Sequence, residues 1–298
     1  MKLLIQLHFQ NGLGNLYTAV VQLLHFANHY KKLGYKCDFI FASKSEFGGN
    51  GWGLNKINIE EIFDMDSFDV FDNVTNIERS IMNKEYNGYT FYGGGNPSGV
   101  WWDVFFSEEI DNFYQLSYGN HDGHIFSNRD FIPNKIPQFN KKIMDKVKIF
   151  ETENIDVNES IQLRLFGFGD SKNYGPNLIG LYDNIYQKLK NKEKKYFLTS
   201  SCVSCLGKVL ELPNVRIINS RLKNEYYGDT ENFLKFPDDN PNNRESRLDF
   251  LYNNIAEMVL ISKTNTVYHE TVLSWTSTFL YYAFVNNPNI KILKINNL

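Results

Sequence analysis

The chain has 298 residues, enough for two domains of ordinary size rather than a single core. With 42% hydrophobic and 22% charged residues, its composition is that of a globular protein and excludes general disorder. A net charge of -3 and a sequence pI near 6.1, with no basic run, argue against nucleic acid as the main partner.

The sequence also predicts the compartment in which the protein works. No segment has the roughly eighteen uninterrupted apolar residues of a transmembrane helix, and polar residues interrupt the apolar start of the chain too early for a signal peptide. Three cysteines, Cys37, Cys202 and Cys205, cannot all pair with one another, which suits a reducing environment. We therefore expect a soluble, cytoplasmic protein with no transmembrane segment.

The first predicted elements are a strand over residues 3–9, an amphipathic helix over residues 16–33 and a second strand over residues 35–42. Such a unit implies parallel strands joined by a right-handed crossover. The turn between the first strand and the helix carries Gly12, Gly14 and Asn15. These residues either bring a ligand to the amides at the helix N-terminus, or they only permit a tight turn that Asn15 caps.

An Asp-x-Asp pair follows in the chain. Asp64 and Asp66 are of the type that holds a divalent cation in metal-dependent sugar transferases. The pair comes after a short helical segment rather than a strongly apolar strand, which favours a solvated turn. We therefore predict no metal site.

Residues 87–103 combine glycines with two adjacent tryptophans, Trp101 and Trp102. Their rings could stack on an acceptor sugar or fill the core, and we expect one to do each. The nearby Asp103 is a candidate general base. Residues 131–158, with two prolines and a lysine-rich helix, are interpreted as a connector. The expected domains are therefore residues 1–157 and residues 158–298.

Residues 160–170 alternate apolar and polar side chains and then reach glycines and Asp170, which predicts a strand followed by a sharp turn. In an open α/β sheet, ligands lie beyond the carboxyl ends of the strands, so Arg164 is a candidate phosphate-binding group. The alternative is an ion pair between Arg164 and Asp170 that braces the turn.

The second half continues with alternating helices and strands. A strand over residues 195–201 ends in the hydroxyls of Ser200 and Ser201. Ser262, Thr264 and Thr266 lie in a hydroxyl-rich turn and could either donate to phosphate oxygens or cap a helix. The other predicted elements of this half are a helix over residues 178–190, a short strand over residues 215–219 and an amphipathic helix over residues 244–261.

Taken in order, these motifs resemble the fucosyltransferase-type GT-B glycosyltransferases. The resemblance rests on the glycine turn after the first strand, the strand that carries Arg164, the strand that ends in hydroxyls, and the Ser/Thr segment before a tryptophan-containing helix. The family's His-x-Arg-x-Gly-Asp motif maps onto Gln162, Arg164, Gly169 and Asp170. Here glutamine replaces the histidine, and the end of the strand is longer.

The resemblance implies an α/β fold of two Rossmann-like domains that face each other across a cleft. The acceptor would contact residues 1–157, and the nucleotide-sugar would bind residues 158–298, where Asp249 would open the later helix. Arg164 and the hydroxyls of residues 262–266 would stabilise the departing diphosphate, so no metal or other cofactor is expected. The candidate bases for the acceptor hydroxyl are His8, Asp103 and Glu46.

The function we predict is an inverting, metal-independent glycosyltransferase that moves fucose from GDP-fucose to a glycan. Another donor, such as UDP-xylose or a rhamnose donor, is the first alternative, because the motif concerns phosphate binding rather than the sugar. A non-catalytic protein that binds a glycan or a nucleotide-sugar is the alternative from a different class. The acceptor, the linkage and a homo-oligomeric state stay open at this point.

Overall fold

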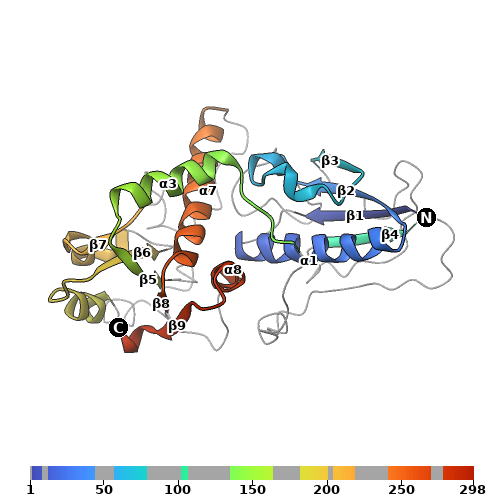
Figure 1. The fold of residues 1–298 in the computed structure, drawn as a ribbon. Coiled ribbons are helices and arrows are strands. Elements are labelled where there is room, and N and C mark those ends of the chain that lie inside the picture. Colours follow the sequence, from blue (N-terminus) through green and yellow to red (C-terminus); the bar gives the residue numbers. More distant parts are fainter. Residues whose placement is uncertain are drawn as a thin grey trace, which may run out of the picture. The chain divides into compact units, whose positions relative to one another are not determined.

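The computed structural model describes residues 2–8, 13–43, 57–78, 102–106, 135–163, 182–200, 204–218, 241–269 and 278–298 (Figure 1). The chain divides into two compact units, Met1–Lys141 and Lys142–Leu298. The division falls at the first residue of helix α3 (Lys141–Glu153), whereas the sequence analysis placed the boundary at residues 157/158. Each unit contains a largely parallel sheet with helices, so the expected fold class of two Rossmann-like α/β domains is confirmed.

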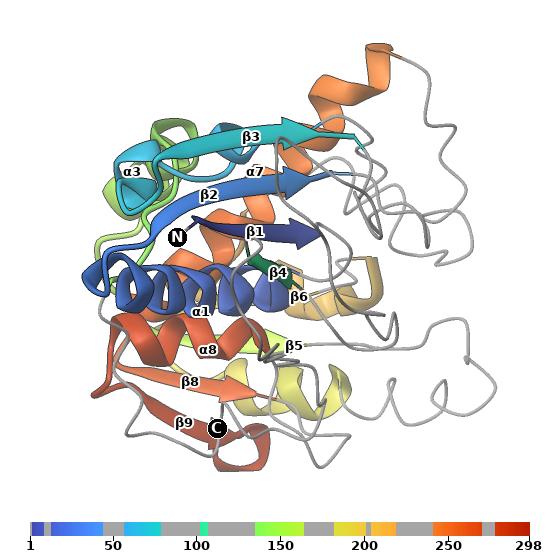
Figure 2. The ribbon, with the colours of Figure 1, turned by 90° about the vertical axis from the view of Figure 1, so that its right-hand side faces the viewer.

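The sheet of the first unit has the strand order β3-β2-β1-β4. Strands β1, β2 and β3 run parallel, and Figure 2 shows their ends pointing to the same edge, whereas β4 pairs antiparallel with β1. The elements of this unit are β1 (Lys2–His8), α1 (Leu13–Lys32), β2 (Lys36–Ala42), the 3-10 helices η1 (Ile59–Glu61) and η2 (Met65–Phe68), β3 (Asn73–Ile77) and β4 (Trp102–Phe106).

An aromatic cluster fills the core of the first unit. Phe39 of β2 is fully buried, and its ring stacks on those of Phe68 and Phe71 with centroids 5.7 and 5.0 Å away. Phe63 stacks on Phe139 at 5.2 Å, which in turn contacts Tyr17 of α1 at 5.8 Å. The apolar face of α1 and the segment around η2 are thus joined to the sheet through ring contacts, which add to the hydrophobic gain from burial.

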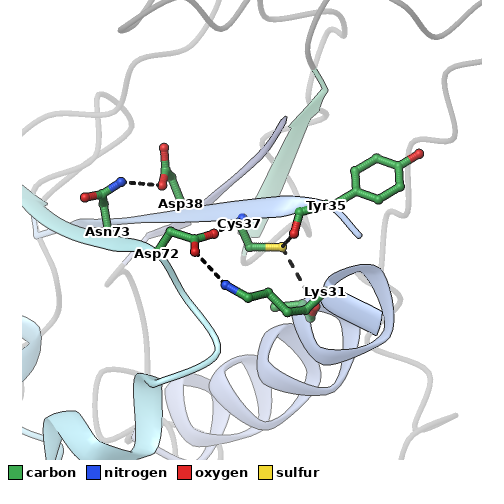
Figure 3. A network of polar contacts seen from close by, with 7 residues as sticks. Lys31, Tyr35, Cys37, Asp38, Asp72 and Asn73 are labelled. Atoms are coloured by element: carbon green, nitrogen blue, oxygen red, sulfur yellow. Dashed lines mark hydrogen bonds and ion pairs between the residues drawn. The ribbon is translucent and has the colours of Figure 1, made fainter. Parts of the chain in front are cut away.

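Asp72 is the centre of a polar network at the start of β2 (Figure 3). Its carboxylate accepts a hydrogen bond from Lys31 Nζ of α1 at 2.6 Å and another from the backbone N–H of Cys37 at 2.7 Å. Burial alone raises the pKa of Asp72, but the hydrogen bonds from Lys31 and Cys37 and the charges of Lys31 and Lys36 together outweigh it. The pKa of Asp72 therefore lies below its ordinary value.

This network makes the stability of the protein depend on pH. A lowered carboxyl pKa stabilises the fold at pH values above the pKa of the unfolded chain, and the effect disappears as the pH falls through the pKa of the folded state. We expect Asp72→Asn to lower the free energy of unfolding at pH 7 by about 1 kcal/mol, since the pair is part-exposed. Denaturant unfolding should show that the difference shrinks between about pH 5 and pH 3.

The control for this prediction is Asp66→Asn, which removes one negative charge at an exposed position of the same unit. It should change the stability by less than Asp72→Asn does. A difference between the Asp72→Asn variant and the natural chain that stays constant from pH 7 to pH 3 would contradict the stabilising role of the Asp72 charge.

The sheet of the second unit has the strand order β7-β6-β5-β8-β9, and all its pairs are parallel. Residues 182–189 are also helical. The other elements of this unit are α3, β5 (Val157–Leu163), β6 (Lys195–Ser200), the 3-10 helix η4 (Ser204–Glu211), β7 (Val215–Arg216), α7 (Pro241–Ser262), β8 (Thr266–His269), α8 (Thr278–Asn286), β9 (Lys291–Lys294) and the 3-10 helix η5 (Ile295–Asn297).

Both faces of this sheet are covered. Ile161 and Leu163 of β5 belong to an apolar cluster that includes Ile185 and Leu189 of the helix over residues 182–189. On the opposite face, Phe197 of β6 contacts the ring of Phe150 from α3 at 4.9 Å. The sheet therefore packs apolar side chains against helices on both of its faces, as in doubly wound α/β folds.

Helix α3 is attached to the second unit by charge as well as by packing. Lys263, just after α7, contacts both carboxylate oxygens of Glu151 at 2.7 and 2.8 Å. Together with the contact between Phe150 and Phe197, this ion pair explains why the unit begins at α3 instead of after it. None of the helices in the described part of the chain is long and apolar enough to cross a membrane.

Candidate active site

The carboxyl ends of the strands in the second unit meet at one edge of the sheet. Leu163 of β5 is in register with Ser200 of β6, and Gln162 with His269 of β8, so three strands end together. Ligands of open α/β sheets bind beyond such an edge. Arg164 is the next residue in the chain after β5, although it lies outside the described residues. This edge is therefore the candidate site.

Four polar residues cross this edge in one register line, which we call the polar row: Thr199, Gln162, His269 and Lys294 of strands β6, β5, β8 and β9. Thr199 and Gln162 are 4% and 5% exposed, His269 is half-buried and Lys294 is exposed. Polar side chains therefore occupy this register line at the ligand edge, and two of them are almost fully buried.

The row can offer several kinds of polar contact to a ligand. A glutamine side chain has both donors and an acceptor, a threonine hydroxyl can act as either, and an imidazole can donate from one or both nitrogens. Lys294 supplies an ammonium group. The chemistry of the row, with two groups that can be cationic and no carboxylate, suits an anionic ligand.

One of the sequence-predicted donor residues lies at this edge. Ser200 ends β6 and is buried, in register with Leu163. Arg164 follows Leu163 in the chain. The remaining candidates of this group, Gly12, Asp170 and Ser201, lie outside the described residues.

Ser262, Thr264 and Thr266 do not join this group. They lie between the end of α7 and the start of β8, which is the amino edge of the parallel sheet, because Thr266 is in register with Glu159 rather than with the end of β5. The Ser262 hydroxyl donates to the Val259 carbonyl at 2.6 Å, so it closes the end of α7.

Thr264 has a structural role at the same place. Its hydroxyl donates to the Ile261 carbonyl at 2.8 Å and lies 2.9 Å from the hydroxyl of Ser160 in β5, with both side chains buried. These bonds end the helix and join it to the central strand. For this reason the site that we describe omits all three residues, and the capping interpretation fits Ser262 and Thr264.

Asp249 also has a different position from the one expected. It lies within α7, which begins at Pro241, so it does not open the helix. Its carboxylate pairs with Lys146 of α3 at 2.6 Å and accepts a hydrogen bond from Asn253 at 3.1 Å. With 57% of its side chain exposed, Asp249 acts as a link between two helices.

The candidates of the first unit gather at the carboxyl edge of its own sheet. β1 ends at His8, and α1 begins at Leu13, so Gly14 and Asn15 lie in the first turn of the helix. Asn15 is thus inside the helix and does not precede it as a cap. The Gly14 carbonyl accepts a hydrogen bond from the Thr18 hydroxyl at 2.7 Å.

β4 brings two further candidates to that edge. Trp102 is in register with Leu7 and Asp103 with Gln6, so both lie on the strand beside the end of β1. Neighbouring strands are about 4.8 Å apart, so Asp103 lies opposite Gln6, two residues before His8. The topology therefore unites candidate bases that are far apart in sequence, while Trp101 and Glu46 lie outside the described residues.

The Asp-x-Asp pair agrees with the turn interpretation. The Asp64 carboxylate accepts a hydrogen bond from the Asp66 amide at 3.1 Å and caps the 3-10 helix η2. Within the parts of the chain that the structure describes, no group of three or more His, Cys, Asp or Glu side chains is placed to hold a metal ion.

A cluster of charged and phenolic side chains in the second unit is centred on Glu159. Glu159, near the start of β5, accepts a hydrogen bond from Lys194 at 2.8 Å. Burial, followed by the charge of Glu159, raises the pKa of Tyr196 to about 12, and the same two causes raise the pKa of Tyr268. Glu159, Lys194 and Tyr196 lie toward the amino edge, whereas Tyr268 precedes His269 in β8, and we assign this cluster a structural role.

His269 and Lys294 were missed by the sequence analysis. Ser262, Thr264 and Thr266 were predicted to lie in a hydroxyl-rich turn, whereas residues 266–269 form β8. A four-residue strand offers too little alternation to be recognised by its pattern. The signal that could have found it is the β-branched and aromatic run Thr266, Val267 and Tyr268 directly after the long helix.

Comparison with known proteins identifies the fold. No family model matches the chain, and no curated protein matches its sequence. Solved structures do match over almost its whole length, and they define the class as the fucosyltransferase-type α/β fold that the sequence motifs predicted.

Structures of the fucosyltransferase NodZ are among those that match. The chain is 15% identical to fucosyltransferase NodZ from Bradyrhizobium, with a TM-score of 0.52. The match covers 100% of this chain and 96% of the NodZ chain. NodZ alpha-1,6-fucosyltransferase co-crystallised with GDP gives 14% identity and a TM-score of 0.51, with the same coverage. The form soaked with GDP-fucose gives 14% and 0.50, over 97% and 94% of the two chains. At such identity the likeness establishes the fold.

Proposed function

We propose that this chain is a glycosyltransferase that uses a nucleotide-sugar donor. The observation that carries the proposal is the carboxyl edge of the second sheet, where a row of polar side chains crosses four strands and the candidate phosphate ligand Arg164 follows β5 directly. The fold supports it, because structures of the same fold are fucosyltransferases studied with GDP and GDP-fucose.

Within this proposal, the second unit binds the donor and the first unit contacts the acceptor glycan, through Trp101 and Trp102 among others. Fucose from GDP-fucose is the donor that we propose first. UDP-xylose or a rhamnose donor is the alternative, since phosphate-binding groups do not select the sugar. The free, buried thiol of Cys37 fits the proposed cytoplasmic location.

The proposed reaction inverts the anomeric carbon. The acceptor hydroxyl attacks that carbon opposite the diphosphate, the bond between the carbon and the diphosphate oxygen breaks, and the transition state resembles an oxocarbenium ion. Arg164 would stabilise the negative charge that grows on the departing diphosphate. His8 or Asp103, which the topology of the first unit brings to one edge, would accept the proton of the acceptor hydroxyl.

A donor screen tests the proposal. The full chain is incubated with GDP-fucose, UDP-xylose and a dTDP-rhamnose donor, with and without a chelator, and release of the nucleoside diphosphate is measured. We expect release from one donor, with GDP-fucose the first choice, and no loss of rate when the chelator is present. Thermal unfolding measured in the presence of each donor should have a higher midpoint temperature with the donor from which the nucleoside diphosphate is released.

Each other outcome has a distinct meaning. Release of the nucleoside diphosphate that the chelator abolishes would contradict metal independence. It would favour a divalent cation held by Asp64 and Asp66. Binding of a nucleotide-sugar or glycan without release would favour a non-catalytic binding protein. Neither release nor stabilisation with any of the donors would contradict the proposed function.

A further inference from the structure

The polar row places two groups that can be cationic on adjacent strands. His269 of β8 is in register with Lys294 of β9, and Figure 2 shows these two strands side by side and ending at the same edge. On its other side, His269 is in register with Gln162, two residues before Arg164 in the chain. Neighbouring strands lie about 4.8 Å apart, so Gln162, His269 and Lys294 fall within a short distance along the edge.

The same residues lie on one face of the sheet. Partners in register on parallel strands present their side chains to the same face, and that face alternates along each strand. The preceding register line on this face contains Phe197, Ser160 and Val267, all of them buried. The side chains therefore change from mainly apolar to entirely polar at the last position before the carboxyl edge.

Exposure increases along the row from the centre of the sheet to its β9 side. Thr199 and Gln162 are almost fully buried, His269 is half-buried and Lys294 is exposed. The positive end of the row is thus the accessible end. An anion that approaches the edge from solvent would meet Lys294 and His269 first, and then the buried amide of Gln162.

We infer that His269 and Lys294 bind the diphosphate of the donor. This inference rests on the proposed function and adds two residues to it. The row supplies hydrogen-bond donors and positive charge at the edge where a doubly wound sheet receives phosphates. The guanidinium of Arg164 is a single group of hydrogen-bond donors, whereas a diphosphate has acceptor oxygens on two phosphorus atoms.

The test measures GDP affinity by calorimetry on the full-length chain. His269→Gln keeps a polar side chain and removes the imidazole, and Lys294→Met keeps the length of the side chain and removes the charge. Lys291→Met is the matched control, because it removes an exposed lysine from the other end of β9. We expect each of the first two changes to weaken GDP binding about tenfold, and the control to leave it unchanged.

Salt dependence separates a charge contact from a structural effect. Loss of a cation that meets the diphosphate should reduce the decline in GDP affinity between low and high salt. A change that only disturbs the sheet would leave this dependence as it is. Lys294→Arg keeps the charge and should bind GDP nearly as tightly as the natural chain. The two Lys294 variants therefore test the inference even where His269→Gln folds poorly.

The outcomes distinguish the inference from the proposed function. GDP or UDP binding by the natural chain, with affinity within about twofold for Lys294→Met and for a folded His269→Gln, would overturn the inference and leave the proposed function in place. Absence of binding to GDP, UDP and dTDP by the natural chain would overturn the two together.

Discussion

Replacement of Arg164 by alanine is expected to lower kcat/KM for the donor by about a thousandfold, as expected for the loss of a main stabiliser of transition-state charge. The guanidinium is always protonated and can donate two parallel hydrogen bonds to phosphate oxygens. In the proposed reaction the negative charge on the diphosphate grows as the sugar departs, so the interaction strengthens in the transition state. The loss should therefore appear in kcat as well as in KM.

The matched control for this change is Arg216→Ala. Arg216 lies in the same unit, in β7, and its guanidinium donates to the backbone carbonyls of Pro213 and Val215 at 2.6 and 2.9 Å. Its removal should leave turnover unchanged. An Arg164→Ala variant that is folded and retains full turnover would remove the residue from the proposed mechanism and favour its pairing with Asp170 instead.

Replacement of Phe39 by alanine should cost about 3–5 kcal/mol of the free energy of unfolding, the usual range for removal of a fully buried aromatic ring. Phe39 has no exposed surface and stacks on both Phe68 and Phe71, so the change would leave a cavity between β2 and the segment around η2. Denaturant unfolding, followed by circular dichroism, would measure the loss.

Leu33→Ala provides the comparison for the Phe39 prediction. Leu33 is 61% exposed at the end of α1, so its truncation should change the stability by no more than about 0.5 kcal/mol. A Phe39→Ala variant as stable as Leu33→Ala would show that the aromatic cluster does not stabilise the first unit as the packing implies.

Long elements with clear periodicity could be predicted from the sequence. The strand, helix and strand expected over residues 3–9, 16–33 and 35–42 appear as β1, α1 and β2 with small shifts at their ends. The amphipathic helix expected over residues 244–261 is α7, and the strand expected over residues 195–201 is β6. In each case the apolar spacing alone is enough to define the element.

Short strands and long-range pairing could not be predicted. β8 has four residues, and β4 joins the first sheet beside β1 from about a hundred residues away, antiparallel to it. A local sequence pattern predicts neither the short strand nor the distant pairing, because the register of strands is set by the packing of the whole sheet. The proximity of Asp103 to the end of β1, and the polar row, follow only from these pairings.

The hydroxyl-rich segment was open to two interpretations for a related reason. Ser and Thr can donate to a phosphate or to nearby backbone carbonyls, and sequence alone does not distinguish these uses. The direction of β8 decides between them. Ser262 and Thr264 precede the strand, so they lie at its amino edge and end helix α7, whereas His269 lies at the other end of the same strand.

The most direct test of this account is a crystal structure of the full chain with GDP. We predict that the diphosphate lies beyond the carboxyl ends of β5, β6 and β8, in contact with the side chain of Arg164. A nucleotide bound to the first unit, or at the amino edge beside Ser262 and Thr264, would contradict the assignment of the donor site.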